Sequence, residues 1–115
     1  MDKLTEYSKL IERILTGYVE LSNHHPNPDI ETFLVVDSSK SHYIWMNLGW
    51  QNGERITGMT VYVRIRGSKF WIEEDWTENG IATELIGEGV PKEDIVLAFH
   101  EPRMRHYTEF AVASS

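Results

Sequence analysis

The spacing of the apolar residues changes once along this chain, and that change limits the folds open to it. Residues 2–21 carry apolar side chains three and four positions apart, which places them on one stripe of a helix. A loop of short polar residues with two prolines follows at 22–29. Beyond it, apolar residues recur at every second position, and β-branched and aromatic types dominate. The sequence therefore predicts a helix followed by β-strands.

Four strands are predicted in succession. They cover Ile30–Asp37, His42–Trp50, Arg55–Arg66 and Lys69–Glu73. Between the second and the third lies Asn52-Gly53, a pair that accepts the positive φ angles of a type I′ turn and is the strongest hairpin signal in the chain. A second tight turn, Gly67-Ser68, precedes the fourth strand. This order predicts an antiparallel meander.

The alternation within the strands predicts the two faces of the sheet. In the second strand, one face holds Ile44, Met46, Leu48 and Trp50, and the other holds Tyr43, Trp45 and Asn47. In the third strand, the predicted core face holds Met59, Val61, Val63 and Ile65, and the wetter face holds Thr60, Tyr62 and Arg64. If Tyr43, Trp45 and Tyr62 lie on the outer face, they form an aromatic patch typical of a protein-partner or homodimer interface. Packing of these rings in the core is the alternative.

The last third of the chain predicts a second helix and a final strand. The helix spans Glu78 to Gly87, with Thr77 as its N-cap, and a short apolar run at Ile95–Phe99 predicts a buried strand. We therefore expect one α+β domain over residues 1–115. It consists of an N-terminal helix packed on a mostly antiparallel β-meander, with a second short helix and a C-terminal strand.

Composition excludes several classes of protein. The chain has no cysteine, which excludes disulfide scaffolds, thiolate metal sites and cysteine nucleophiles. No apolar run approaches the roughly 20 residues that span a bilayer, so we expect a cytoplasmic protein. The net charge of −7 argues against autonomous binding of nucleic acid, which draws its affinity from basic side chains.

The basic residues nevertheless form two small groups. One comprises Arg55, Arg64, Arg66 and Lys69, and the other Arg103, Arg105 and His106. The second group, with Tyr107, could contact an acidic partner surface or a phosphate, although a C-terminal strand whose bases pair with nearby acids needs no ligand. Stacking of single-stranded nucleic acid on the aromatic face, beside Arg64, is the rival to protein association.

No established catalytic motif is present, because the chain lacks a glycine-rich phosphate loop, a GxSxG elbow and an HExxH pair. Two clusters keep weaker alternatives open. His100 and His106 with Glu101 and Glu109 could supply metal ligands, and the run Glu73-Glu74-Asp75 could bind a hard cation or act as acid and base. We predict no catalytic residue, metal ligand or cofactor; a small enzyme or metal-binding protein is the less favoured alternative.

Four blocks of sequence carry a resemblance to a known family. They are MDKLTEYSKLIERIL at the start, FWIEEDWTENGIATELI, GVPKEDIVLAFHEP (Gly89–Pro102) and RHYTEFAVA (Arg105–Ala113). These blocks, in this order and over nearly the whole chain, resemble those of the XisI family. Its members are the cyanobacterial fdxN element excision controlling factors. The resemblance implies a small α+β accessory or control factor, rather than the recombinase, for excision of a DNA element from a nitrogen-fixation gene during heterocyst differentiation. It offers no agreed catalytic residue to assign to this sequence.

The resemblance also implies partners. The protein would associate with XisH, a nuclease-like companion, and act with a site-specific recombinase, so that it meets DNA through its partners. The residues expected to bind partners are Tyr43, Trp45, Tyr62, Arg64, Arg103, Arg105, His106 and Tyr107. Five further positions match the family motif without an assigned role: Gly89, Pro91, Asp94, His100 and Pro102.

Overall fold

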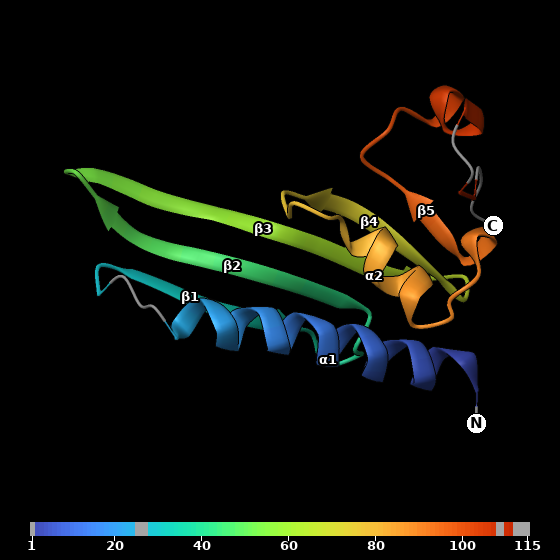
Figure 1. Cartoon of the computed structure of the whole chain (residues 1–115), viewed down its shortest axis with the longest axis horizontal. Coiled ribbons are helices and arrows are strands. Elements are labelled where there is room, and N and C mark those ends of the chain that lie inside the picture. The colour runs from blue at the N-terminus through green and yellow to red at the C-terminus, as the bar shows by residue number, and fades with distance from the viewer. Residues whose placement is uncertain (1, 25–27, 108–109, 112–115) are drawn as a thin grey trace.

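In the computed structural model, which describes residues 2–24, 28–107 and 110–111, both α-helices lie on the same face of a five-stranded sheet (Figure 1). The elements are α1 (Lys3–Asn23), β1 (Ile30–Val36), β2 (His42–Gln51), β3 (Glu54–Arg66), β4 (Lys69–Asp75), α2 (Ile81–Gly87), η1 (Lys92–Asp94), β5 (Ile95–Leu97) and η2 (Pro102–Tyr107). The strands follow one another in chain order across the sheet. β1 to β4 form an antiparallel meander and β5 pairs in parallel with β4. The predicted α+β architecture is confirmed.

The helix α1 covers the sheet with one apolar stripe, as its sequence period predicts. It begins after Asp2, whose carboxylate accepts a hydrogen bond of 2.8 Å from the backbone N–H of Thr5 and so satisfies one of the free donors of the first turn. Ile11 and Leu15 in its middle are completely buried. Among the described residues, no helix is both long and apolar enough to cross a membrane.

The predicted hairpin turn is confirmed. Asn52 and Gly53 have φ angles of 53° and 81°, the two positive values that a type I′ turn requires. The turn joins β2 and β3, the two longest strands, which extend together beyond the rest of the sheet (Figure 1). We call this end of the molecule, from Trp50 to Arg55, the hairpin tip.

The start of α2 differs from the prediction. It begins at Ile81 rather than Glu78, and its N-cap is Gly80 rather than Thr77. The cause is Asp75 at the end of β4, whose carboxylate accepts hydrogen bonds from the backbone N–H of Thr77 and, at 2.7 Å, of Ile81. A side chain outside the helix thus supplies the acceptor that an N-cap residue normally provides.

The helix α2 ends in a Schellman motif. Val90 donates its N–H to the carbonyl of Leu85, and Gly89 donates to Ile86, with Gly89 at a φ of 95°. Val90 and Leu85 are both buried, which adds the apolar contact that accompanies this motif. Gly89, a family-motif position, therefore has a backbone role.

Polar contacts fix α2 against α1. The hydroxyl of Tyr18 donates a hydrogen bond of 2.5 Å to Glu84, and Arg13 forms an exposed ion pair of 2.9 Å with Glu88. The hydrogen bond to Glu84, together with burial, raises the pKa of Tyr18 to about 12. The two helices therefore cover the sheet as one layer.

The core lies between that layer and the inner face of the sheet. Its completely buried side chains include Tyr43 of β2, Val61 and Val63 of β3, and Phe70 of β4. Ile81 and Leu85 of α2 and Ile95 of β5 complete it. Tyr7 of α1 stacks on Phe70 with ring centroids 4.5 Å apart.

One glycine is required by a close approach of two strands. A Cβ atom on Gly49 of β2 would lie 2.0 Å from the carbonyl oxygen of Asp29, at the start of β1. That oxygen also accepts the N–H of Trp50 at 2.9 Å, so it cannot move away without breaking the strand pairing.

We therefore expect Gly49→Ala to lower the free energy of unfolding by about 3 kcal/mol, the upper part of the range for overpacking. Gly58→Ala on β3 is the matched control, because its Cβ meets nothing within 4 Å, and it should change stability little. Urea unfolding followed by circular dichroism measures both. Equal effects of the two substitutions would contradict this account of the β1–β2 contact.

Candidate functional site

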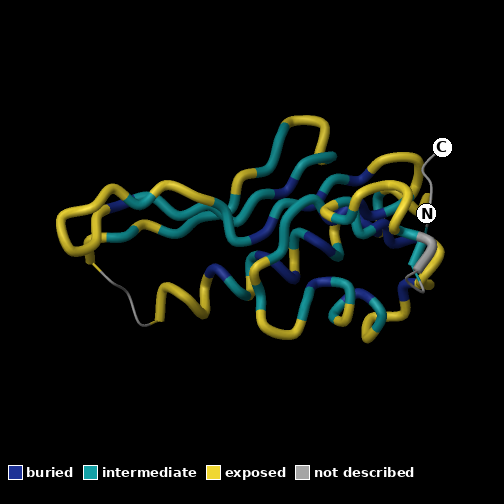
Figure 2. The backbone as a smooth tube through the Cα atoms, turned by 90° about the horizontal axis from the view of Figure 1, so that it is seen from above, coloured by how far each residue is buried: buried dark blue, intermediate teal, exposed yellow. Residues whose placement is uncertain are grey.

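The face of the sheet opposite the helices carries apolar side chains that lie outside the core. Figure 2 colours many residues of these strands as half-buried rather than buried. Residues paired across antiparallel strands share a face. The row Phe33–Met46–Met59 and the row Val35–Ile44–Tyr62 therefore run side by side across β1, β2 and β3. The outer patch, as we call it, consists of Phe33, Val35, Ile44, Met46, Leu48 and Met59. None of the six belongs to the core or packs against it.

Two residues expected on this surface lie on the other side. Tyr43 is completely buried in the core, where its hydroxyl donates to the carbonyl of Lys40 at 2.9 Å. Trp45 packs against the core and stacks on Tyr18 of α1, with ring centroids 5.7 Å apart. The expectation that Tyr43 and Trp45 form an exposed patch with Tyr62 is therefore wrong.

Met59 lies on the opposite face of the sheet from the predicted one, because β3 contains a bulge. Trp45 pairs with Val61 and Met46 pairs with Met59, which leaves Thr60 as an extra residue without a partner on β2. The bulge shifts the alternation by one position. Met59, predicted to face the core with Val61, therefore joins the outer patch.

Tyr62 and Arg64 do lie on the outer face, at the border of the outer patch. The hydroxyl of Tyr62 lies 2.9 Å from Nδ1 of His42, and Arg64 forms a part-buried ion pair of 3.0 Å with Glu73. Both polar ends are thus engaged within the molecule, and the ring of Tyr62 extends the apolar surface.

Arg105 has a structural role. Its guanidinium donates to the carbonyls of His100 and Ala98 at 3.1 and 3.2 Å and lies over the ring of Trp71, 5.8 Å from its centroid. These contacts anchor the segment around η2 on the outer face beside β4 and β5. Arg103 is exposed and pairs with Glu101 at 2.8 Å. The side chains of His106 and Tyr107 lie outside the described part of the structure.

Each carboxylate of the run Glu73-Glu74-Asp75 is engaged by a neighbouring side chain or backbone group. Glu73 holds Arg64, and Asp75 accepts hydrogen bonds at the start of α2. Glu74 accepts a hydrogen bond of 2.9 Å from the indole N–H of Trp76. These three residues line a shallow groove with Trp76 and Phe99, which are 74% and 51% exposed. We call it the acidic groove.

The less favoured metal-binding alternative involves His100, Glu101, His106 and Glu109, and the side chains of His106 and Glu109 lie outside the described part of the structure. No three His, Asp or Glu side chains converge within residues 2–24, 28–107 and 110–111. The ring of His100 lies against Phe99, with centroids 4.7 Å apart, and Glu101 pairs with Arg103.

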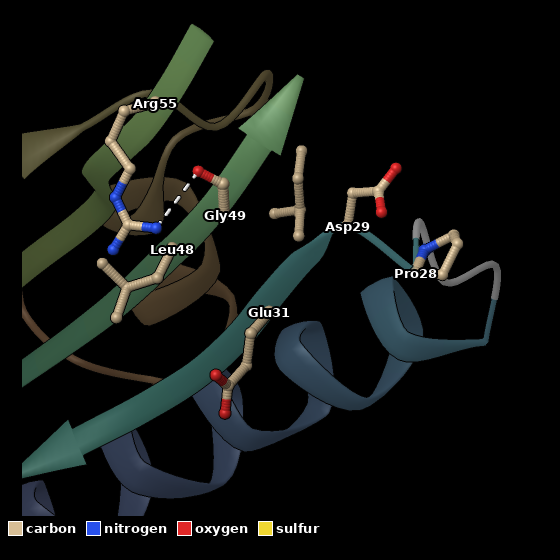
Figure 3. Close-up of a pocket in the computed structure, with 7 residues that line it drawn as sticks. Pro28, Asp29, Glu31, Leu48, Gly49 and Arg55 are labelled. Atoms are coloured by element: carbon tan, nitrogen blue, oxygen red, sulfur yellow. Dashed lines mark hydrogen bonds between the residues drawn. The ribbon is translucent and has the colours of Figure 1, made fainter. Parts of the chain in front are cut away.

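A second hollow lies where β1 begins, beside the hairpin tip (Figure 3). Its lining includes Asp29, Glu31 and Arg55. Figure 3 shows the guanidinium of Arg55 turned toward the carbonyl of Gly49, at 3.5 Å, and apart from both carboxylates. Arg55 also lies over the ring of Trp50, 5.4 Å from its centroid.

Asp94 is buried at the centre of a polar network. Its carboxylate accepts a hydrogen bond of 2.6 Å from Tyr7 and lies 2.7 Å from the ammonium of Lys3, which ties the start of α1 to the start of β5. Burial alone would raise the pKa of Asp94, but these two partners and the charge of Lys69 outweigh it and hold the pKa below its ordinary value. Asp94 is thus explained as a structural residue.

The other motif positions are also placed by backbone geometry. Pro91 precedes η1, and its carbonyl accepts the N–H of Asp94 at 3.0 Å. Pro102 begins η2, and the carbonyl of His100 accepts from Arg105. Of the five motif positions, Gly89, Pro91, Asp94 and His100 therefore form contacts that hold this part of the chain in place.

Comparison with known proteins agrees with this fold. The sequence model of the XisI protein family matches residues 1–112. A XisI-like protein from Anabaena variabilis ATCC 29413 is 37% identical, with a TM-score of 0.89 over 96% of this chain and 99% of its own. The fdxN element excision controlling factor XisI from the same organism is 40% identical, with a TM-score of 0.84 over 97% of this chain and all of its own. No curated protein matches.

The network of Asp94 predicts how stability depends on pH. Because its pKa is lowered in the folded state, the carboxylate stabilises the fold above the unfolded value of about 3.9, and this contribution is lost as pH falls through the folded pKa. We expect Asp94→Asn to lower the free energy of unfolding by about 2 kcal/mol at neutral pH and to flatten the acid limb of the stability curve. Glu93→Gln, an exposed neighbour, is the control. Parallel curves for wild type and Asp94→Asn would contradict the assignment.

Proposed function

Because this chain belongs to the XisI family, we propose that it is a non-catalytic control factor for excision of a DNA element, and that it acts by binding other proteins. One partner is a XisH-like, nuclease-like companion, and the other, reached through it, is a site-specific recombinase. A role in excision control is supported by the name of the 40% identical relative. The mode of action is argued from the surface of this chain.

The uncovered outer patch is the observation that carries the proposal. Val35 is 38% exposed, and the other five side chains are half-buried. A contiguous apolar patch of this kind costs free energy in water, and on soluble proteins it marks a binding surface for another protein. Tyr62 at its border adds the aromatic surface that is enriched in interfaces.

The contacts of four of the six arginines support protein association over direct contact with DNA. Arg64 is paired with Glu73, Arg13 with Glu88 and Arg103 with Glu101, and Arg105 is bound to backbone carbonyls. A phosphate would have to compete with these contacts. With a net charge of −7, the chain has little basic surface to release counterions from a duplex.

Co-expression with the nuclease-like companion, followed by size-exclusion chromatography, tests the proposal. We expect the two proteins to elute together at micromolar concentration, and we expect Ile44→Asp with Met46→Asp to separate them, because carboxylates would be desolvated in the contact. Leu21→Asp is the matched control, since Leu21 is 62% exposed on α1 and outside the outer patch. Circular dichroism shows whether each variant is folded.

Independent elution of the two wild-type proteins would overturn the proposal. Tight binding of a DNA duplex by the isolated chain at low salt, weakening steeply as salt is added, would favour direct DNA binding instead.

A further inference from the structure

Opposite charges border the outer patch, a cation at the hairpin tip and carboxylates in the acidic groove. At the hairpin tip, Arg55 lies over Trp50, which is 55% exposed. At the other end lies the acidic groove, with Glu74 and the exposed ring of Trp76. Among the described residues, neither Arg55 nor Glu74 forms an ion pair. The cation and the carboxylate lie at two borders of the outer patch. Among the described residues, Arg55 contacts the ring of Trp50 and the carbonyl of Gly49, and Glu74 accepts a hydrogen bond from Trp76.

We propose that the outer patch is the interface of a two-fold symmetric dimer of this chain, in which the hairpin tip of each copy lies in the acidic groove of the other. The inference rests on the proposed function only in treating the outer patch as a protein-binding surface. It adds a second occupant of this patch, another copy of this chain, and the companion would compete with that copy for the same surface.

The register of the sheet makes such a dimer self-consistent. Glu74 pairs with Tyr62, which is seven residues from Arg55 along β3, or about 23 Å at the usual rise of a strand. A two-fold axis that lies in the interface and runs across the strands reverses the strand direction. It therefore places Arg55 of one copy near Glu74 of the other, twice per dimer.

The middle of the surface fits the same symmetry. The axis crosses β3 halfway between residues 55 and 62, beside Met59, so the two Met59 side chains meet near the axis. Phe33 and Met46 share the row of Met59 and would pack against their counterparts. Each copy then covers the apolar surface of the other, as the two sheets of a β-sandwich do.

Charge complementarity is the reason to commit to a second copy. Two chains of net charge −7 repel each other, so opposite charges that meet at the contact favour dimerisation. The arrangement supplies two Arg55–Glu74 contacts. Arg55 and Glu74, which have no ion-pair partner among the described residues of one chain, would then find one in the other copy.

Charge reversal with mixing tests the dimer. We expect sedimentation equilibrium to show a wild-type dimer, and we expect Arg55→Glu and Glu74→Arg each to raise its dissociation constant by about tenfold or more, because each creates two like-charge contacts. An equimolar mixture of the two variants should restore dimers, since both of its contacts join opposite charges. Misfolded chains would not recover on mixing. Lys9→Glu and Glu20→Arg, exposed on α1, are matched controls that should leave the dimer unchanged.

A wild-type chain that stays monomeric would overturn the dimer, and so would single variants that dimerise as the wild type does or a mixture that fails to recover. These outcomes are separable from those of the proposed function. A monomer that binds the companion overturns the dimer alone, whereas a dimer that never binds the companion overturns the proposed function alone.

Discussion

A sheet with apolar side chains on both faces needs a cover on both, and this chain provides two helices, which pack on the same face. The ion pair of Arg13 with Glu88 and the hydrogen bond of Tyr18 to Glu84 hold them there as one layer. The described part of the C-terminal segment covers the β4–β5 end of the other face, through Arg105 on Trp71. The remaining apolar surface over β1 to β3 has no cover among the described residues, and we propose that another chain covers it. The proposed mode of action follows from this imbalance.

The remaining polar features serve the fold. Asp94 ties α1 to β5, Asp75 supplies the acceptors at the start of α2, and Arg105 holds the segment around η2. Residues that from their type alone suggest chemistry are thus occupied by structural contacts. What distinguishes the outer face is the opposite condition, since Arg55 and Glu74 lie on it without an ion-pair partner among the described residues.

The sequence predicted most of the architecture, because each element has a local signal. The helical stripe of α1, the Asn52-Gly53 turn and the order of the strands all depend on contacts between near neighbours in the chain. The start of α2 was missed because its capping acceptor, Asp75, comes from the preceding strand. Such a contact across six residues has no periodic signature.

The candidate surface was assigned to the wrong residues for a related reason. The two faces of β2 both carry large apolar side chains: Tyr43 and Trp45 on one, Ile44 and Met46 on the other. The alternation of residue types therefore does not indicate which face is the inner one. The bulge at Thr60 then moves Met59 to the outer face without any change in composition. A usable signal was present all the same: strands that are apolar on both faces indicate a sheet covered on both.

Methionine oxidation measures the central claim directly, because the outer patch contains Met46 and Met59 while Met104, 46% exposed, lies in η2. Hydroxyl-radical footprinting of the assembled protein should show strong protection of Met46 and Met59 relative to a monomeric charge-reversal variant, with Met104 reacting equally in both. Equal reactivity of Met46 and Met59 in the two samples would show that the outer patch stays open to water and would contradict the account.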